Sequence, residues 1–273
     1  MSVPGTSELT PLRAGSIVWE PPAPREIMRW PLPYQRWTNR CLVRGLALLA
    51  RRQVLVIHGL EHVRPAQDPF ILALNHSTRR EALLVPALLV LHRGGRLIHF
   101  VADWNFRLIP GIGMLYRRGG AITVARKPAR PRVLNVLKPL YTDALPAMER
   151  ARAYLNAGRS VGIFPEGTVN RDPQRLLRGR MGAARLSLET GAPIVPVGIR
   201  FPGAEPGEKI SDRARMEIRI GAPLTPPALG RHASAPLPDV RAWHAAVMQE
   251  IAHLSGKAWT STTNSAGSIS DEP

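Results

Sequence analysis

Two stretches of the chain decide its fold: residues 70–81 read FILALNHSTRRE, and residues 160–168 read SVGIFPEGT. Each opens with a short apolar run typical of a buried strand and stops abruptly at polar side chains. An apolar helix-like run at 82–91 follows the first stretch, and a helical pattern at 145–156 precedes the second. Corners between strands and helices are where α/β folds place binding and catalytic side chains. We therefore expect the chemistry of this chain at the ends of these two strands.

The remainder of the chain continues this alternation of strand-like and helix-like segments. Such alternation predicts one α/β domain, with a mixed, largely parallel central sheet flanked by helices and preceded by a basic amphipathic N-terminal helix. A loop is expected at 127–142. The predicted strands are 54–58, 70–74, 96–102, 121–125, 160–164, 194–200 and 216–220. The predicted helices are 34–52, 82–91, 104–116, 145–156, 180–189 and 238–254.

Composition divides the chain into four parts. Residues 1–33 are rich in proline and predict an extended, loosely packed arm. Residues 34–52 combine an apolar stripe with flanking arginines, which suits either a helix lying in a lipid headgroup layer or an ordinary helix packed on the domain. The globular domain is expected over 53–254. The polar, small-residue stretch 255–273 predicts a disordered tail.

The charge of the chain points to a polyanionic partner. Its 37 Lys and Arg residues against 20 Asp and Glu give a net charge of +17, which suits nucleic acid or an anionic membrane face. Nucleic acid is not expected, because the chain lacks zinc-finger spacing, a phosphate-cradling loop and an aromatic-rich RNA signature. The single Cys41 excludes an intrachain disulfide and a Cys-rich zinc site, and we expect no metal. No secretory signal and no transmembrane helix are expected, since the longest apolar run is too short.

His76 and Glu81 form the first candidate site. They lie five positions apart, so they can pair only if the chain turns between them rather than continuing as a helix. A carboxylate bonded to one ring nitrogen fixes the tautomer and strengthens the other nitrogen as a base toward an alcohol. The alternative is a histidine that caps the next helix, with Glu81 favoured in its first turn by the helix dipole.

The second candidate site is the FPEGT turn together with nearby arginines. Glu166 can bind an acceptor hydroxyl or position the base, Gly167 permits a positive φ, and Thr168 offers a hydroxyl and an amide. A plain turn is the alternative. Arg126 ends GAITVAR, and Arg178 and Arg180 lie in LLRGRMG. Guanidinium groups at these places suit a phosphomonoester, although in so basic a chain they also suit an ordinary surface.

Four segments resemble, in order, the motif blocks of the glycerolipid acyltransferases, which include lysophosphatidic acid and glycerol-3-phosphate acyltransferases. The segments are NHSTRRE at 75–81, GAITVAR at 120–126, FPEGT at 164–168 and IVPVGI at 194–199. The resemblance covers about 70–200. It departs from the family pattern at Glu81, where aspartate is usual, and at Val169, where an arginine commonly stands. The domain at 53–254 is accordingly expected to be the acyltransferase domain.

The resemblance implies a reaction without an acyl-enzyme, in which His76 deprotonates the acceptor and Glu81 orients its ring. The alkoxide then attacks the thioester of acyl-CoA or acyl carrier protein, with no other cofactor. The expected acceptor is 1-acylglycerol-3-phosphate, with glycerol 3-phosphate or another lysolipid as the alternative. The resemblance also implies peripheral residence at the cytoplasmic face of a membrane. The substrate-binding residues it implies are Asn75, Gly120, Arg126, Phe164, Pro165, Glu166, Gly167, Thr168, Arg178 and Arg180.

Two other hypotheses compete with this one. Residues 158–162, GRSVG, fit the G-x-S-x-G pattern of serine hydrolases. A nucleophile elbow requires a strand before the serine and a helix after it, and here the expected order is reversed, which argues against Ser160. The other hypothesis is a non-catalytic basic protein that binds anionic lipid or nucleic acid, and loss of His76 would separate it from an enzyme.

Overall fold

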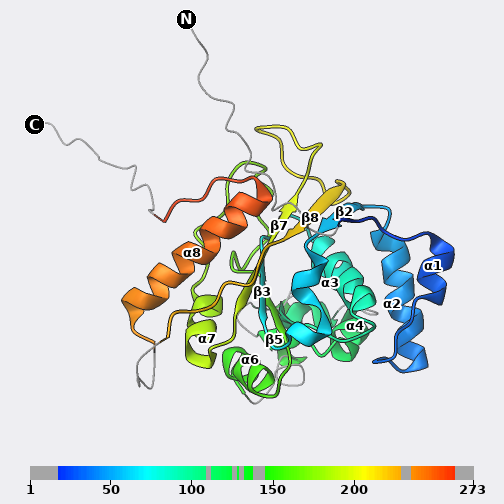
Figure 1. Cartoon of the computed structure of the whole chain (residues 1–273), viewed down its shortest axis with the longest axis horizontal. Coiled ribbons are helices and arrows are strands. Elements are labelled where there is room, and N and C mark those ends of the chain that lie inside the picture. The colour runs from blue at the N-terminus through cyan, green and yellow to red at the C-terminus, as the bar shows by residue number, and fades with distance from the viewer. Residues whose placement is uncertain are drawn as a thin grey trace, which may run out of the picture.

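A computed structural model describes residues 18–108, 112–124, 128, 132–137, 145–228 and 235–261. Within these ranges the strands form one eight-stranded sheet in the order β1-β2-β8-β7-β3-β6-β4-β5 (Figure 1). The strands are β1 Val18–Trp19, β2 Val54–His58, β3 Ile71–Leu74, β4 His99–Asp103, β5 Ile122–Val124, β6 Val161–Ile163, β7 Ile194–Arg200 and β8 Met216–Ile220.

Parallel pairing dominates the sheet. Strands β7, β3, β6, β4 and β5 are successive parallel neighbours, and β2 is parallel to β8. Only the β1–β2 and β7–β8 pairs of the described sheet are antiparallel. The structure thus confirms the expected α/β domain with a mixed, largely parallel sheet. In the register, Ala73 lies opposite both Ile163 and Pro196, so β3, β6 and β7 end at the same edge.

Helices cover both faces of the sheet, with α7 and α8 on one side and α2 and α3 on the other (Figure 1). Side chains of β3 alternate between two cores, because Leu72 and Leu74 pack toward α2 and α3 while Ile71 and Ala73 pack toward α6, α7 and α8. The α-helices are α1 Pro24–Arg29, α2 Trp37–Ala50, α3 Glu81–His92, α4 Ile112–Arg118, α6 Ala147–Asn156, α7 Gly182–Thr190 and α8 Leu237–Ser255. The 3₁₀ turns are Leu60–Val63, Pro65–Gln67, Trp104–Leu108 and Arg132–Leu137.

A close contact joins α8 to the sheet. Gly198 of β7 has no side chain, and a Cβ at this position would lie only 2.2 Å from the backbone carbonyl carbon of Leu254. The last turn of α8 therefore rests directly on the strand, at a distance that any larger residue would prevent.

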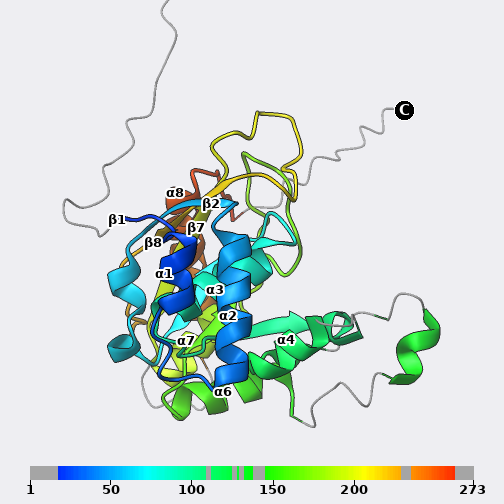
Figure 2. The ribbon, with the colours of Figure 1, turned by 90° about the vertical axis from the view of Figure 1, so that its right-hand side faces the viewer.

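Helix α2 packs on the domain. It lies against α3 (Figure 2) and buries Val43, Ala47 and Ala50. Three of its basic side chains are engaged locally, because Arg40, Arg44 and Arg51 donate hydrogen bonds to backbone carbonyls of residues 35, 30 and 22. The structure thus shows the helix packed on the domain, and contact of its exposed face with a lipid headgroup layer stays a prediction. The structure also leaves apolar side chains of α2 exposed, among them Trp37 and Leu49.

Several elements differ from the sequence expectation. The helix expected at 104–116 is a 3₁₀ turn at Trp104–Leu108 and a separate helix α4. The strand expected from residue 96 begins only at His99, because Arg96 is ion-paired to Asp68 beside two positive-φ glycines. The loop expected at 127–142 lies largely outside the described residues.

Both terminal segments contain packed residues where loose chain was expected. In the arm predicted over 1–33, strand β1 pairs with β2, and α1 buries Ile27. In the tail predicted over 255–273, Ser255 completes α8 and Lys257 is buried. The described chain continues to residue 261. Packing against the domain therefore extends into both segments.

Candidate active site

The two sequence stretches that end in polar residues meet at the carboxyl edge of the sheet. Strands β3 and β6 are parallel neighbours, so Asn75 and His76 leave the sheet beside Phe164 and the FPEGT turn. The imidazole of His76 lies with its centroid 4.4 Å from that of the Phe164 ring. Adjacent parallel strands bring together residues that are about ninety positions apart, as expected for an α/β fold.

His76 and Glu81 form a hydrogen-bonded pair. Nδ1 of His76 is 2.8 Å from Oε1 of Glu81, and the side chain of Glu81 is 0% exposed. The carboxylate fixes the neutral tautomer with its proton on Nδ1, which leaves Nε2 as the basic atom. The His76 side chain is 13% exposed. The ring is therefore held by a buried carboxylate while part of it remains accessible to solvent. Glu81, although one methylene longer than aspartate, reaches the imidazole.

The loop between the two residues supplies further hydrogen bonds to the carboxylate. The Ser77 amide donates to Oε1 of Glu81 and the Thr78 hydroxyl approaches Oε2, while the Thr78 hydroxyl also accepts from the Glu81 amide. Burial raises the pKa of Glu81, and the hydrogen bond and charge of His76 oppose that rise. The carboxylate therefore depends on its neighbours to remain ionised.

Glu166 ties three loops together rather than facing an open pocket. Its Oε1 accepts a bond of 2.9 Å from the His76 amide, and its Oε2 accepts bonds from the Asn170 side chain at 2.7 Å and the Leu177 amide at 2.9 Å. The Asn170 amide in turn donates to the His76 carbonyl. Of the two roles considered for Glu166, the contacts favour positioning the base over binding an acceptor hydroxyl.

Gly167 and Thr168, the last two residues of the FPEGT turn, are exposed beside basic side chains. Gly167 adopts a φ of +67°, and a Cβ there would lie 2.6 Å from Nε of Arg180, which packs across the turn. The Arg180 amide also donates to the carbonyl of the buried Pro165. Thr168 and Arg178 are exposed nearby in the sequence. The structure thus brings Arg180 to the turn.

Other predicted residues stand apart from the base or have their polar atoms engaged. Both polar atoms of the Asn75 amide bond the backbone of Ile199 in β7, at 3.1 and 2.7 Å, which anchors the loop. Gly120 precedes β5 at the opposite, amino edge of the sheet, where its carbonyl lies 3.0 Å from Nδ1 of His99. Arg126 lies outside the described residues.

Ser160 is not placed as a nucleophile. It is buried at the start of β6, its hydroxyl donates to Asp68, and it accepts a bond of 3.1 Å from the Phe70 amide. Strand follows this serine, as expected from the sequence, and the hydroxyl lies at the edge of the sheet opposite His76.

Three residues at the site escaped sequence reasoning: Asn170, Ser77 and Lys257. Asn170 and Ser77 lie close to recognised motifs, so their proximity offered a signal. Lys257 lies in a stretch that looked like a tail, and nothing in its local sequence indicates burial. Its ammonium nevertheless reaches Ser77 with a hydrogen bond of 2.8 Å.

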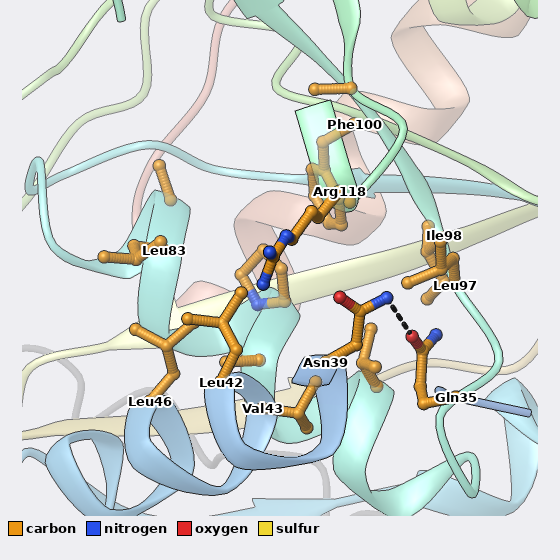
Figure 3. A pocket seen from close by; sticks show the side chains of 16 residues that line it. Gln35, Asn39, Leu42, Val43, Leu46, Leu83, Leu97, Ile98, Phe100 and Arg118 are labelled. Atoms are coloured by element: carbon orange, nitrogen blue, oxygen red, sulfur yellow. Dashed lines mark hydrogen bonds between the residues drawn. The ribbon is translucent and has the colours of Figure 1, made fainter. Parts of the chain in front are cut away.

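An apolar cavity of about 120 Å³ lies between α2 and α3, and its lining includes residues next to Glu81 as well as Gly119 and Ala121 near the amino edge of the sheet. Leu42, Val43 and Leu46 line it from α2, and Leu83 and Phe100 line it from the domain (Figure 3). Ala82 and Leu83 directly follow Glu81, and Phe100 packs on Phe164, with ring centroids 5.9 Å apart. The Phe164 ring therefore lies between the cavity lining and His76.

Fold and site together define an α/β protein with a histidine–carboxylate base at the carboxyl edge of its sheet, beside an apolar cavity. A family model described as Acyltransferase matches residues 54–200, more than half of the chain. The chain belongs to this acyltransferase family.

Curated relatives carry the name 1-acyl-sn-glycerol-3-phosphate acyltransferase. The chloroplastic protein BAT2 of Brassica napus is 28% identical over 147 residues, covering 54% of this chain and 37% of the relative. The chloroplastic LPAT1 of Arabidopsis thaliana is 28% identical over 171 residues, covering 62% and 43%. The Bacillus subtilis protein is 24% identical over 177 residues, covering 65% and 77%. The chain thus spans less than half of the length of both chloroplast relatives.

A solved structure shares the fold. The crystal structure of PlsC from Thermotoga maritima, titled as a 1-acyl-sn-glycerophosphate (LPA) acyltransferase, superposes with a TM-score of 0.52 at 19% identity. The match covers 86% of this chain and 80% of that one. At this identity the likeness concerns the fold alone.

Proposed function

We propose that this protein transfers a fatty acyl group from a thioester donor to the hydroxyl of a lysophospholipid, with 1-acylglycerol-3-phosphate as the acceptor. The observation that carries the proposal is the His76–Glu81 pair, whose Nδ1–Oε1 bond of 2.8 Å leaves Nε2 available in a partly exposed ring. The names of the curated relatives support the choice of acceptor.

The chemistry needs one base and no protein nucleophile. Nε2 of His76 takes the proton of the acceptor hydroxyl while its oxygen attacks the carbonyl carbon of the thioester, forming a C–O bond. The tetrahedral intermediate collapses with cleavage of the C–S bond, and the leaving thiolate takes the proton back from His76. Glu81 stabilises the transient imidazolium from the other ring nitrogen. The products are the ester and the free thiol of CoA or acyl carrier protein.

The surface around the base suits a phosphorylated acceptor. Arg180 lies across the FPEGT turn, and Arg79 and Arg178 are exposed close to the catalytic loops in the sequence. Guanidinium groups form charge-assisted, bidentate bonds with phosphate oxygens. Arg171 is less suited, because its guanidinium already bonds Asp212 and the carbonyl of residue 210, each at 2.6 Å.

The apolar cavity suits the hydrocarbon chain of a substrate. Its walls are formed mainly by aliphatic side chains of α2 and α3. They include Leu83, two residues after Glu81, and Phe100, which packs on the Phe164 ring beside His76. A chain lying there would leave its carboxyl end close to the base.

Peripheral attachment to the cytoplasmic face of a membrane is part of the proposal. No helix within the described ranges is long and apolar enough to cross a bilayer. The net charge of +17 favours an anionic surface. Trp37, which is 75% exposed, and Leu49 on α2 offer apolar contacts of the kind found at lipid interfaces.

A donor-by-acceptor assay tests the proposal. Purified wild-type protein is incubated with acyl-CoA or acyl carrier protein and with 1-acylglycerol-3-phosphate, glycerol 3-phosphate or other lysolipids, and new ester is measured. We expect turnover with 1-acylglycerol-3-phosphate, and a loss of about 10³-fold in kcat for His76→Ala with unchanged binding to anionic vesicles. Wild-type turnover in His76→Ala would overturn the role of the base. Absence of turnover with every pair would overturn the function.

A further inference from the structure

Lys257 reaches the catalytic loops from the far end of the chain. Helix α8 ends at Ser255, and Gly256 follows with a left-handed φ of +69°. The turn at Gly256 reverses the chain, and the next side chain, Lys257, is only 5% exposed. Its Nζ donates to the Ser77 hydroxyl at 2.8 Å and to the Asp172 carbonyl at 2.7 Å. A buried ammonium bonded to two loops from other parts of the chain indicates a specific role rather than a chance contact.

Ser77 connects this cation to the catalytic pair, because its hydroxyl contacts Lys257 and its amide contacts Glu81. Ser77 lies between His76 and Glu81 in the loop, and its amide donates to the same Glu81 oxygen that His76 bonds. The Asn75 amide also approaches the Ser77 hydroxyl, at 3.4 Å. Displacement of Ser77 would therefore move the donor that holds the Glu81 carboxylate.

The charge balance of the site gives Lys257 a second reason to be buried. Glu81 and Glu166 are two buried carboxylates that each hydrogen-bond His76, and an uncompensated charge in such a place is costly. Burial lowers the pKa of Lys257, and the charges of Glu166, Glu81 and Asp172 oppose that shift. By the same attraction the ammonium favours the ionised form of Glu81.

We infer that Lys257 is a positioning residue for acyl transfer: through Ser77 it holds the loop 76–81 in place, and its charge keeps Glu81 ionised against His76. The inference rests on the proposed function of His76 as the base. Lys257 itself touches neither substrate nor the reacting atoms.

The variants that test this role leave the other charged groups around Lys257 and the catalytic pair unchanged. The cavity beside Lys257, of about 360 Å³, gives room for a larger cation at this position. Glu81, Glu166 and Asp172 attract the Lys257 ammonium, and Arg200, Glu217 and Arg219 line the same cavity. Arg79 lies in the catalytic loop, and Arg180 packs on Gly167 of the neighbouring turn.

Three variants test the role of Lys257. Lys257→Met removes the charge at similar length, Lys257→Arg keeps the charge, and Lys209→Met is the matched control at an exposed lysine. For Lys257→Met we expect kcat to fall about tenfold with little change in KM, and the acidic limb of the kcat profile to move up by roughly one pH unit. Lys257→Arg should return the acidic limb of the kcat profile to its wild-type position. Lys209→Met should match wild type in kcat, KM and pH profile.

A purely structural lysine would give a different result. Lys257→Met would then lower the midpoint of thermal unfolding without moving the pH profile, and this outcome would overturn the inference, as would a wild-type kcat in the folded variant. If the acidic limb of the kcat profile in Lys257→Arg stayed at the position found for Lys257→Met, the role of the charge would be overturned.

A titration that needs no turnover separates this inference from the proposed function. The Glu81 carboxyl carbon is followed by ¹³C NMR in selectively labelled protein and assigned with Glu81→Gln. We expect its titration in Lys257→Met about one pH unit above that of wild type and of Lys209→Met. If wild-type protein transfers no acyl group but this shift is present, the function fails while the electrostatic role of Lys257 stands. If turnover is present and the shift absent, only the inference on Lys257 fails.

Discussion

Buried charges gather at both edges of the central sheet, and the two clusters behave differently. At the amino edge, Arg93 bonds both oxygens of Asp68, at 2.7 and 2.8 Å, and Ser160 and Arg96 also contact that carboxylate. At the carboxyl edge, Glu81 is satisfied by its neighbours, but the His76 ring keeps one side open to solvent. A buried polar network becomes reactive when one member retains an unbonded, accessible atom.

Helix α3 connects the two clusters. Glu81 is its first residue, and Arg93 caps its carboxyl end. This arrangement places a carboxylate at the positive end of the helix dipole and a guanidinium at the negative end. One helix therefore carries a functional charge at one edge and a structural charge at the other, and variants at its two ends test the comparison.

The largest effect is expected at the amino edge. Asp68→Ala leaves Arg93, whose side chain is 0% exposed, without its carboxylate partner, and should lower the free energy of unfolding by about 3–5 kcal/mol. Urea denaturation measures this loss. The control Arg152→Ala breaks the half-exposed pair with Glu189 and should cost under about 1 kcal/mol. Equal losses for both variants would contradict a structural role for the Asp68 cluster.

At the carboxyl edge, Glu81→Gln should damage catalysis instead of folding. The neutral amide cannot stabilise the imidazolium, so we expect kcat to fall roughly 10²-fold. Steady-state kinetics measure the change, and circular dichroism checks the fold. An active Glu81→Gln variant would show that His76 works without its partner and would remove the distinction between the two edges.

A smaller loss is expected for Glu166→Gln. Both carboxylate oxygens of Glu166 accept hydrogen bonds, and an amide NH₂ in place of one oxygen would face a donor. The His76 loop should shift, and kcat should fall about tenfold. The exposed Glu208 offers the control Glu208→Gln, which should retain full activity. A change in KM alone would instead favour a role for Glu166 in acceptor binding.

The smallest effect concerns stability as a function of pH. Burial raises the pKa of Glu81 in the folded protein, so the stability that this group contributes is fully present below its unfolded pKa and is lost as pH rises through the folded pKa. Glu81→Gln should therefore match wild type in acid and become more stable by about 1 kcal/mol at alkaline pH. Denaturation curves at several pH values measure the difference. If the stability gained by Glu81→Gln over wild type became smaller as pH rises, the raised pKa of Glu81 would be contradicted.

The sequence predicted the parts of the fold that follow from local pattern. Apolar runs that stop at polar residues located β3 and β6, and their parallel arrangement explains why His76 and Phe164 meet. The split of the segment 104–116 into a 3₁₀ turn and a helix was missed. Packing of the two terminal segments was missed as well, because it depends on tertiary contacts that proline-rich or polar composition does not reveal.

The sequence predicted the catalytic pair, but it did not predict most of the hydrogen bonds that hold this pair in place. The sequence allowed His76 to pair with Glu81 on the condition that the chain turns between them, and the structure confirms the contact. The anchoring of Asn75 on β7 and of Glu166 on residues 170 and 177 could not be predicted, since both depend on how loops fold over the sheet edge. The sequence did not show which of the arginines near the motifs lie at the site, because the chain has many arginines.

The missing side chain of Gly198 has a consequence for the charges at the carboxyl edge of the sheet. Helix α8 approaches β7 at that glycine, and Lys257 is carried on the two-residue extension of the same helix. A single methyl group at position 198 would lift the helix end and withdraw the ammonium from Ser77. With the role proposed for Lys257, the ionisation of Glu81 depends partly on the spacing between a helix and a strand, at a position that touches neither the base nor its carboxylate.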